Sequence, residues 1–204
     1  RPEGTEPDLP HADANAARRA LAGDGTDAPP PGDGADAPPP GDDGWITGPR
    51  ARAVLDAYGI LGSGGPRPDV ASPPGSPGGG IEAVAGFVQE PSFGPLVRLG
   101  PPGAAGPGAP HGVALAPLTV EDAQDLVRPL SGAGPGLGAT ADGPGDLGPV
   151  VDLVLRLGRL AEDLPEVAEA ECRLVLGPGT GVSVSGARLR LTVPVRADDR
   201  RRLT

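Results

Sequence analysis

The clearest pattern of hydrophobic and polar positions lies in the last third of the chain. From Pro149 onward, apolar residues fall on one helical face, at positions 150, 153, 154, 157, 160 and 161. The step Asp163-Leu-Pro165 should end this helix. Residues 170–176 then alternate apolar and polar side chains, and a turn at 177–181 leads to a strand over 182–193. The alternation shifts at Gly186, which predicts a bulge, so we expect residues 149–193 to form a helix packed on a hairpin.

Upstream, the pattern predicts another strand pair and three further helices. A strand over 81–88, a turn at 91–94 and a strand near 96–99 form the pair. The predicted helices cover 12–21, 45–60 and 119–130. Asp13 should cap the first of them. The second has Thr47 as its cap, Pro49 in its first turn and Gly59 at its end. The last of these opens with a capping box at Thr119–Asp122 and should turn Val120, Ala123, Val127 and Leu130 inward. Helices and strands together predict an α/β fold of the α+β kind.

Segments rich in glycine and proline separate these elements and reduce the number of residues that can form a folded core. The 204 residues include 35 Gly and 29 Pro, and only four side chains are aromatic. An acidic tandem repeat occupies 23–40 within an Asp/Pro-rich linker over 23–44, and Gly/Pro-rich stretches fill 61–80, 100–110 and 131–145. Such segments bury little apolar surface, so we expect long disordered linkers around a small core built from Val, Leu and Ala.

Charge and cysteine content exclude several classes of function. The net charge of −10 argues against nucleic acid and anionic membrane as partners, because both require clustered cations. All 17 basic residues are arginine, and no apolar run is long enough for a membrane span. Cys172 is the single cysteine, so an intrachain disulfide is impossible and a cytoplasmic location is expected. The chain opens with Arg1 and contains no Met, which predicts that it is a fragment.

One passage carries a specific resemblance. Residues Gly80-Ile-Glu-Ala-Val-Ala-Gly-Phe-Val-Gln-Glu-Pro-Ser-Phe-Gly-Pro95 resemble the strand and turn of the ATP-grasp domain in ADP-forming acyl-CoA synthetases of the acetate–CoA ligase type. The weaker matches keep the family's order; they are Arg1–Leu9, Gly44-Trp45, Ala57–Ile60, Ala116–Thr119, Leu157–Ala161, Leu164–Glu169 and Ala187–Leu191. The resemblance implies ATP and Mg²⁺ as cofactors and a CoA-ligase or CoA-binding domain, in cis or in trans, as partner. In some relatives this assembly is fused to a GNAT N-acetyltransferase.

The resemblance also implies a division of the chain and a partial ATP-grasp-like lobe, in which two or three helices pack on a mixed or antiparallel sheet. The expected segments are the tail of an upstream CoA-ligase region (1–22), an Asp/Pro-rich linker (23–44), the first helix of the ATP-grasp region (45–60), an irregular linker in place of the ATP-grasp N-lobe (61–80), the C-lobe (81–193) and a charged tail (194–204). Residues 61–80 are too few for that N-lobe, because three strands and two helices of mean length need about 40 residues.

The expected nucleotide and metal site departs from the family at several positions. Arg173 stands where the resemblance implies an Asn ligand, and Gly186 stands where it implies an Asp. The glycine loop after Phe-Gly-Pro is altered to Leu99-Gly-Pro-Pro-Gly103, and the chain has no Lys to hold phosphate. Glu82 keeps its motif position and is the one candidate nucleotide or metal contact; the alternative is a solvent-facing acid at the start of a strand. We therefore predict no metal ligands and no catalytic residues.

Other reactive side chains lack suitable neighbours in the sequence. His11 and His111 stand apart from other ligand residues, Ser63 and Ser92 show no triad, and Cys172 fits a core position. The leading hypothesis is an ATP-grasp-derived domain of an acyl-CoA synthetase-like protein, with a defective site and a structural or regulatory role, that is not catalytic as this fragment. The alternative is an active ATP-binding part of an acetate or acyl-CoA ligase completed by an upstream domain. A decayed gene product is the third possibility.

Overall fold

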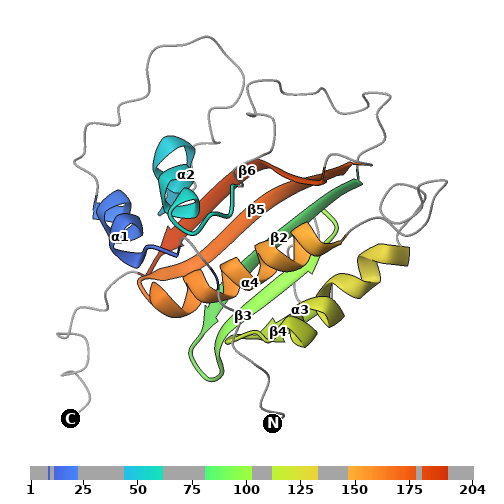
Figure 1. Cartoon of the computed structure of the whole chain (residues 1–204). Helices are drawn as coiled ribbons and strands as arrows, with labels where there is room; N and C mark the ends of the chain where they lie inside the picture. Colours follow the sequence, from blue (N-terminus) through green and yellow to red (C-terminus); the bar gives the residue numbers. More distant parts are fainter. Residues whose placement is uncertain are drawn as a thin grey trace.

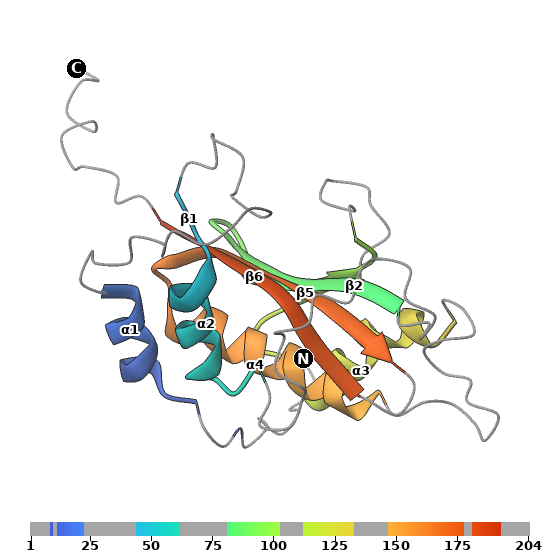
Figure 2. The same ribbon diagram turned by 90° about the horizontal axis from the view of Figure 1, so that it is seen from above.

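The computed structural model describes residues 9, 12–22, 44–61, 81–102, 112–132, 147–177 and 181–192. In this part of the chain, six antiparallel strands form one sheet in the order β1-β6-β5-β2-β3-β4, and the helices lie against one of its faces (Figures 1 and 2). The elements are α1 (Ala14–Ala22), β1 (Trp45–Ile46), α2 (Gly48–Asp56), β2 (Ile81–Glu90), β3 (Gly94–Gly100), β4 (Gly112–Leu115), α3 (Val120–Val127), the 3₁₀ helix η1 (Arg128–Gly132), α4 (Gly148–Asp163), β5 (Val167–Gly177) and β6 (Gly181–Leu191). The predicted fold class is confirmed.

Two hairpins form the middle of the sheet. β2 pairs with β3 through a turn that ends at Gly94, whose φ of 89° lies in the left-handed region that favours glycine. β5 pairs with β6, and their register shifts where Arg173 faces Gly186 but the next residue, Leu174, faces Val184. Ser185 is therefore the extra residue of a bulge beside Gly186, as the sequence predicts.

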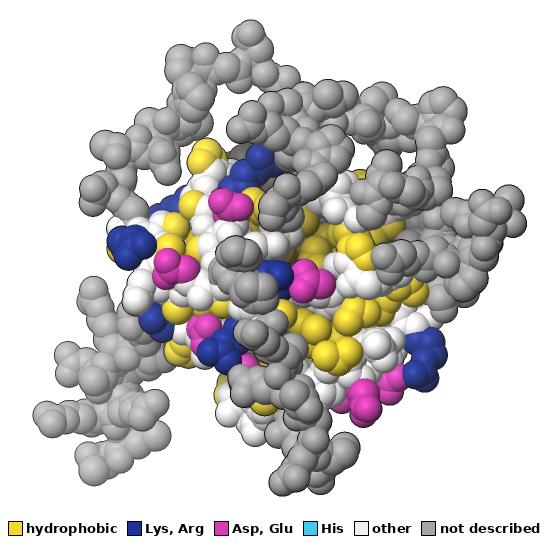
Figure 3. Space-filling view, viewed as in Figure 1, with side chains coloured by type: hydrophobic (Ala, Val, Ile, Leu, Met, Phe, Trp, Pro, Cys, Tyr) yellow, Lys and Arg dark blue, Asp and Glu magenta, His cyan; other side chains and the backbone are white. Residues whose placement is uncertain are grey.

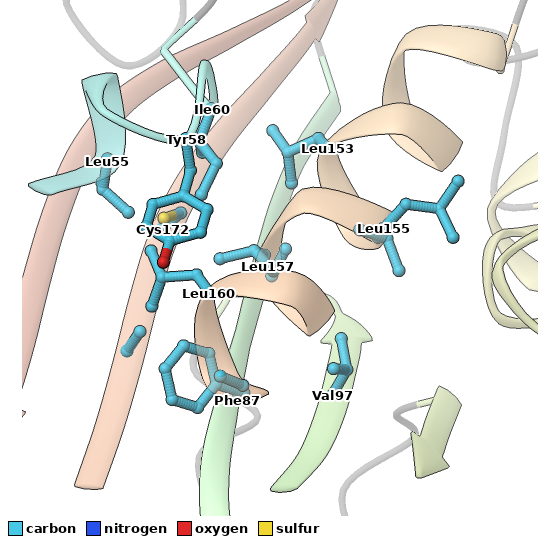
Figure 4. Close-up of a cluster of buried hydrophobic side chains, with 14 of the residues drawn as sticks. Leu55, Tyr58, Ile60, Phe87, Val97, Leu153, Leu155, Leu157, Leu160 and Cys172 are labelled. Atoms are coloured by element: carbon cyan, nitrogen blue, oxygen red, sulfur yellow. The ribbon is translucent and has the colours of Figure 1, made fainter. Parts of the chain in front are cut away.

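Helix α4 provides most of the apolar layer on the sheet. The predicted stripe is buried in full: Val150, Leu153, Val154, Leu157, Leu160 and Ala161 are all at most 4% exposed. Figure 4 shows Leu153, Leu157 and Leu160 among the side chains of this core, near Phe87 of β2 and Val97 of β3. The predicted packing partner needs correction, because α4 lies mainly over β2 and β3 and not on the β5–β6 hairpin alone.

Helices α1 and α2 cover the β6 end of the same face. The predicted cap of α1 is present, since the backbone N–H of Ala16 donates to Asp13 Oδ1 at 2.8 Å. The predicted helix over 45–60 starts later than expected, because Trp45 and Ile46 pair with β6 as the short strand β1. Thr47 is the N-cap of α2, although its side chain makes no capping hydrogen bond.

Tyr58, just after α2, makes two hydrogen bonds to α4. Its hydroxyl donates to Asp163 Oδ2 at 3.2 Å, and Arg156 Nη1 donates to its carbonyl at 3.0 Å. Burial, followed by the charge of Asp163, raises the pKa of the Tyr58 phenol well above its usual value. Gly59 follows with a φ of 65° and lies against Arg156, so the predicted glycine end of this helix is confirmed.

The region from β4 to α3 contains one confirmed prediction and two differences. The capping box is present, because Thr119 and Asp122 each bond to the other's backbone N–H. Val120 was expected inside but is 41% exposed, and Leu126 is buried instead. Strand β4 was not predicted, because its four residues follow a Gly/Pro-rich stretch and give too short an alternation.

Several predictions fall outside the described residues. These are the linkers over 23–43, 62–80, 103–111 and 133–146, the turn residues 178–180 and the tail 194–204. The division into domains therefore stays a prediction. Among the described helices, none is long and apolar enough to cross a membrane.

Candidate functional site

The two faces of the sheet carry different side chains. On β5, Ala170, Cys172 and Leu174 turn toward the helices, and we call this side the helical face. Glu169, Glu171 and Arg173 alternate with them and turn away from the helices. We call that side the open face; it is the upper side of the sheet in Figure 2, with the helices below. Its other charged positions on neighbouring strands are Glu82, Glu90, Arg98, Arg188 and Arg190.

Glu169 joins three strands through two ion pairs. Arg190 Nη2 of β6 donates to Glu169 Oε2 at 2.8 Å, and Arg98 Nη2 of β3 donates to the other carboxylate oxygen. The Glu169 side chain is only 15% exposed, so these bonds are less screened than surface pairs. Both oxygens of this carboxylate are therefore already used in holding the sheet together.

Glu171 is bound in a similar way. Arg188 Nη2 donates to Glu171 Oε2 at 2.9 Å, and the Arg188 guanidinium carbon lies 4.4 Å from the centroid of the Trp45 ring. Arg190 lies 5.6 Å from the same centroid. Glu171 is buried, at 8% exposure, so the attraction of the neighbouring guanidinium offsets the cost of removing its charge from water.

The structure brings together the positions where the resemblance implies metal ligands. Arg173 and Gly186 face each other directly across β5 and β6, and Glu171 lies two residues from Arg173 on the same face. A Cβ built on Gly186 would lie 3.8 Å from Arg173 Cδ, so the arginine side chain runs beside the position where the resemblance implies a carboxylate. The Arg173 side chain is exposed and forms no ion pair or hydrogen bond within the described residues.

Glu82 lies at the margin of this group, because it is two residues along β2 from Val84, which faces Arg173, but it is far from Glu171. It faces Val175 near the start of β2, whereas Glu171 faces Gly86, four residues further along the strand. At about 3.3 Å per residue, the two acids are separated by roughly 13 Å along the strand direction. Glu82 is exposed, and the described residues contain no group of three His, Cys, Asp or Glu side chains that could hold a metal ion. Its role as a nucleotide contact stays a prediction.

The remaining candidates are placed as follows. Ser92 lies exposed in the turn between β2 and β3, and Cys172 is fully buried on the helical face. Burial raises the pKa of the Cys172 thiol to about 12, so it stays protonated and is a poor nucleophile. His11, His111 and Ser63 lie outside the described residues.

Sequence reasoning missed the ion pairs of the open face. Glu169 and Glu171 are spaced by two, as are Arg188 and Arg190, and this is the spacing of one face of a strand. The two pairs could therefore have been assigned to one side of the hairpin. Their partners Arg98 and Trp45 come from other strands, and the sequence carries no signal for those contacts.

Comparison with known proteins places this sheet in a family. Residues 71–191 match the profile of the ATP-grasp domain. The chain is 30% identical over 114 residues to the acetate–CoA ligase (ADP-forming) I of Archaeoglobus fulgidus, covering 55% of this chain and 17% of that protein. It is 30% identical over 93 residues to the beta subunit of acetate–CoA ligase (ADP-forming) I of Pyrococcus furiosus, covering 45% of this chain and 40% of the subunit.

One solved structure is also similar to this chain. The dinucleotide forming acetyl-coenzyme A synthetase 1 of Ca. Korarchaeum cryptofilum, solved with coenzyme A and Mg-AMPPCP, is 25% identical to this chain. The match covers 56% of this chain and 54% of that chain, with a TM-score of 0.45. The chain thus spans less than two thirds of each of these three relatives. Since the family profile matches more than half of its residues, the chain belongs to the ATP-grasp domain family.

Proposed function

We propose that this ATP-grasp domain has lost productive binding of a magnesium nucleotide, and that it has a structural or regulatory role in an ADP-forming acyl-CoA synthetase-like protein. The observation that carries the proposal is Arg173 lying directly opposite Gly186. A cationic side chain lies where the family resemblance implies a neutral ligand, and the acid expected across from it is absent.

Electrostatics explains why these two substitutions matter. Two unit charges of the same sign 4 Å apart repel by about 4 kcal/mol at an effective dielectric constant of 20, and a divalent ion doubles that energy. The loss of an acid at position 186 removes an attraction of similar size. Glu171, the acid that remains, is already paired with Arg188 at 2.9 Å. A metal ion would have to displace one guanidinium and tolerate another.

The partner in this proposal is a CoA-ligase or CoA-binding region, in cis or in trans. The support is the similarity to an ADP-forming acetate–CoA ligase and to the beta subunit of another, together with the small share of each that the chain spans. A cytoplasmic location is part of the proposal, because the only cysteine of the chain is a buried thiol, as suits a reducing compartment.

Calorimetry with Mg-ATP tests the proposal. The wild-type chain should show no binding in the micromolar range, with the family's acetate–CoA ligase as a positive control. The double variant R173N/G186D should bind more tightly than wild type, because it removes the cation and returns the acid. Micromolar binding by the wild-type chain, dependent on Mg²⁺, would contradict the defective site.

A coupled assay tests the alternative of an active ligase. The chain is mixed with the CoA-ligase portion of a relative, and formation of ATP from acyl-CoA, ADP and phosphate is followed. We expect no ATP above the level of the ligase portion alone. Turnover that is abolished by Glu82→Ala would establish the enzyme instead.

A further inference from the structure

Strand β4 is an edge of the sheet whose outer side is unpaired within the described residues. It pairs with β3 alone and stands last in the strand order, next to α3 (Figure 1). The backbone N–H of Ala116 donates to the carbonyl of Pro95 at 2.9 Å, so backbone groups alternate from there between β3 and the outer side. Val113 and Leu115 therefore direct their N–H and C=O groups away from β3, where an added strand can bond to them.

The exposed apolar side chains of the described residues gather at the same corner. Four large hydrophobic side chains are exposed: Phe93 at 72%, Val113 at 58%, Val120 at 41% and Leu115 at 40%. Val113 and Leu115 belong to β4, and Val120 begins α3. Phe93 lies in the β2–β3 turn, two residues before Pro95, whose carbonyl is bonded to the end of β4. Clustering of this kind marks an interaction surface, whereas hydrophobic residues exposed singly do not.

Strand β4 also lacks the features that usually prevent an edge from pairing. Its residues Gly112–Leu115 include no charge and no proline. The opposite edge of the sheet differs, because β1 covers one end of β6. The rest of β6 carries the bulge at Ser185 and the charged side chain of Arg188. Within the described part of the chain, β4 is thus the edge on which a further strand fits best.

Helix α3 sets the charge that an added strand meets on one side. It lies directly against β4, since a Cβ on Gly112 would approach Leu126 Cδ1 to 2.6 Å. Three exposed acids of α3 outnumber the one exposed arginine that follows it; they are Glu121, Asp122 and Asp125 against Arg128. The side chains of a strand alternate between its two faces. In a strand added to β4, one set would lie near this acidic helix and the other beside the exposed apolar side chains of β4.

We propose that β4 accepts, as a seventh strand of the sheet, an extended protein segment in which apolar residues alternate with Lys or Arg. Its backbone bonds to Val113 and Leu115, its apolar side chains pack on the open face, and its basic side chains lie near α3. A second copy of this chain suits the edge less well, because it would bring another acidic α3 beside the first. The inference goes beyond the proposed function and does not depend on the state of the nucleotide site.

Calorimetry with a synthetic peptide tests the edge on the full 204-residue chain. The probe is acetylated and amidated Gly-Val-Arg-Val-Arg-Val-Gly, and the matched control peptide has Glu in place of both Arg. We expect the basic peptide to bind with a Kd on the order of 100 µM, because the four residues of β4 offer a small interface. The acidic peptide should bind at least tenfold more weakly.

Two variants of β4 place the contact. Val113→Pro removes an N–H group from the outer side and leaves the bonds to β3 intact, so it should weaken peptide binding at least tenfold. Val113→Thr keeps that N–H and should stay within threefold of wild type. Leu115→Lys adds a positive charge at an exposed edge position and should weaken the basic peptide at least fivefold. It replaces Val113→Pro as the test if circular dichroism shows that the proline variant is unfolded.

Glu121→Gln tests the contribution of α3. The loss of one acid should weaken binding of the basic peptide two- to threefold, and added salt should reduce this difference. The matched control is Asp56→Asn, which removes an exposed acid from α2 at the other end of the sheet and should leave the Kd unchanged.

Three results would overturn the inference: no saturable binding of the basic peptide, equal binding of the two peptides, or equal binding by wild type and a folded Val113→Pro. The first is expected if other residues of the chain already cover the edge. Sedimentation of the chain without peptide tests a second copy as occupant, and a dimer that Val113→Pro dissociates would contradict the proposed partner. None of these results concerns Mg-ATP, so the proposed function is tested separately.

Discussion

The two faces of the sheet differ in the interactions that hold them. The helical face packs α4 against β2 and β3 through side chains that are almost wholly buried, including Leu157, Phe87 and Val97. The open face is held by ion pairs across strands, with Glu169 and Glu171 at its centre. In Figure 3, which views the molecule from the helices, basic and acidic groups are interspersed among hydrophobic surface. Stability therefore comes mainly from one face, and the charges on which the proposed loss of nucleotide binding rests lie on the other.

The largest effect should follow from a cavity in the helical face. Leu157→Ala removes a side chain that is 0% exposed, and we expect the free energy of unfolding to fall by about 2–5 kcal/mol. Urea denaturation followed by circular dichroism measures it. Val175→Ala, at a half-buried position on the open face, is the control and should cost well under half as much. If both variants lost the same free energy of unfolding, stability would not come mainly from the helical face.

A smaller effect is expected for the ion pairs of the open face. Glu169→Gln weakens the bonds to Arg98 and Arg190. We expect the free energy of unfolding to fall by about 1–2 kcal/mol, because these bonds are charged but only partly buried. Added salt should reduce the difference from wild type. The control is Glu82→Gln, because Glu82 is an exposed acid of the same face without an ion pair among the described residues. Its free energy of unfolding should stay within about 0.5 kcal/mol of the wild-type value. If both variants lose the same amount, the pairs contribute no stability of their own.

The smallest effect on stability at neutral pH is expected from the ionisation of Cys172, which also reports on how rigid the helical face is. Its pKa is raised from 9.0 to about 12 by burial, so the folded protein should resist a thiol reagent at pH 8, whereas the unfolded protein reacts at once. The raised value also fixes the direction of a pH effect. The folded state keeps its proton while the unfolded thiol ionises above pH 9, so stability is unaffected below pH 9 and falls as pH rises toward 12.

Absorbance of the released chromophore measures the reaction. Rapid labelling of the native chain at pH 8, at the rate seen in urea, would show that the helical face opens readily and is not the rigid side of the sheet. Cys172→Ser serves as the blank, because it removes the only thiol of the chain.

Sequence reasoning succeeded where a periodic signal was long or a local motif was complete. The stripe of α4 spans about three turns, and the capping box of α3 lies within four residues, so neither needs a distant partner to be recognised. It failed where a distant segment decides the outcome. Trp45 looked like the approach to a helix but pairs with β6, and Val120 fits the inward stripe but faces solvent. Strand β4 has only four residues and needs β3 beside it to be a strand at all.

The chemistry of the site divides in the same way. The amino-acid sequence alone determined that Arg173 and Gly186 replace the residue types that the family resemblance implies, because residue identity needs no coordinates. Only the tertiary structure decided that the two face each other, that Glu171 is already held by Arg188, and that Glu82 and Glu171 are separated by roughly 13 Å along the strand direction. The reason is that strand register and ion pairing depend on contacts between segments far apart in the chain, whereas residue type and helical period are properties of the local sequence.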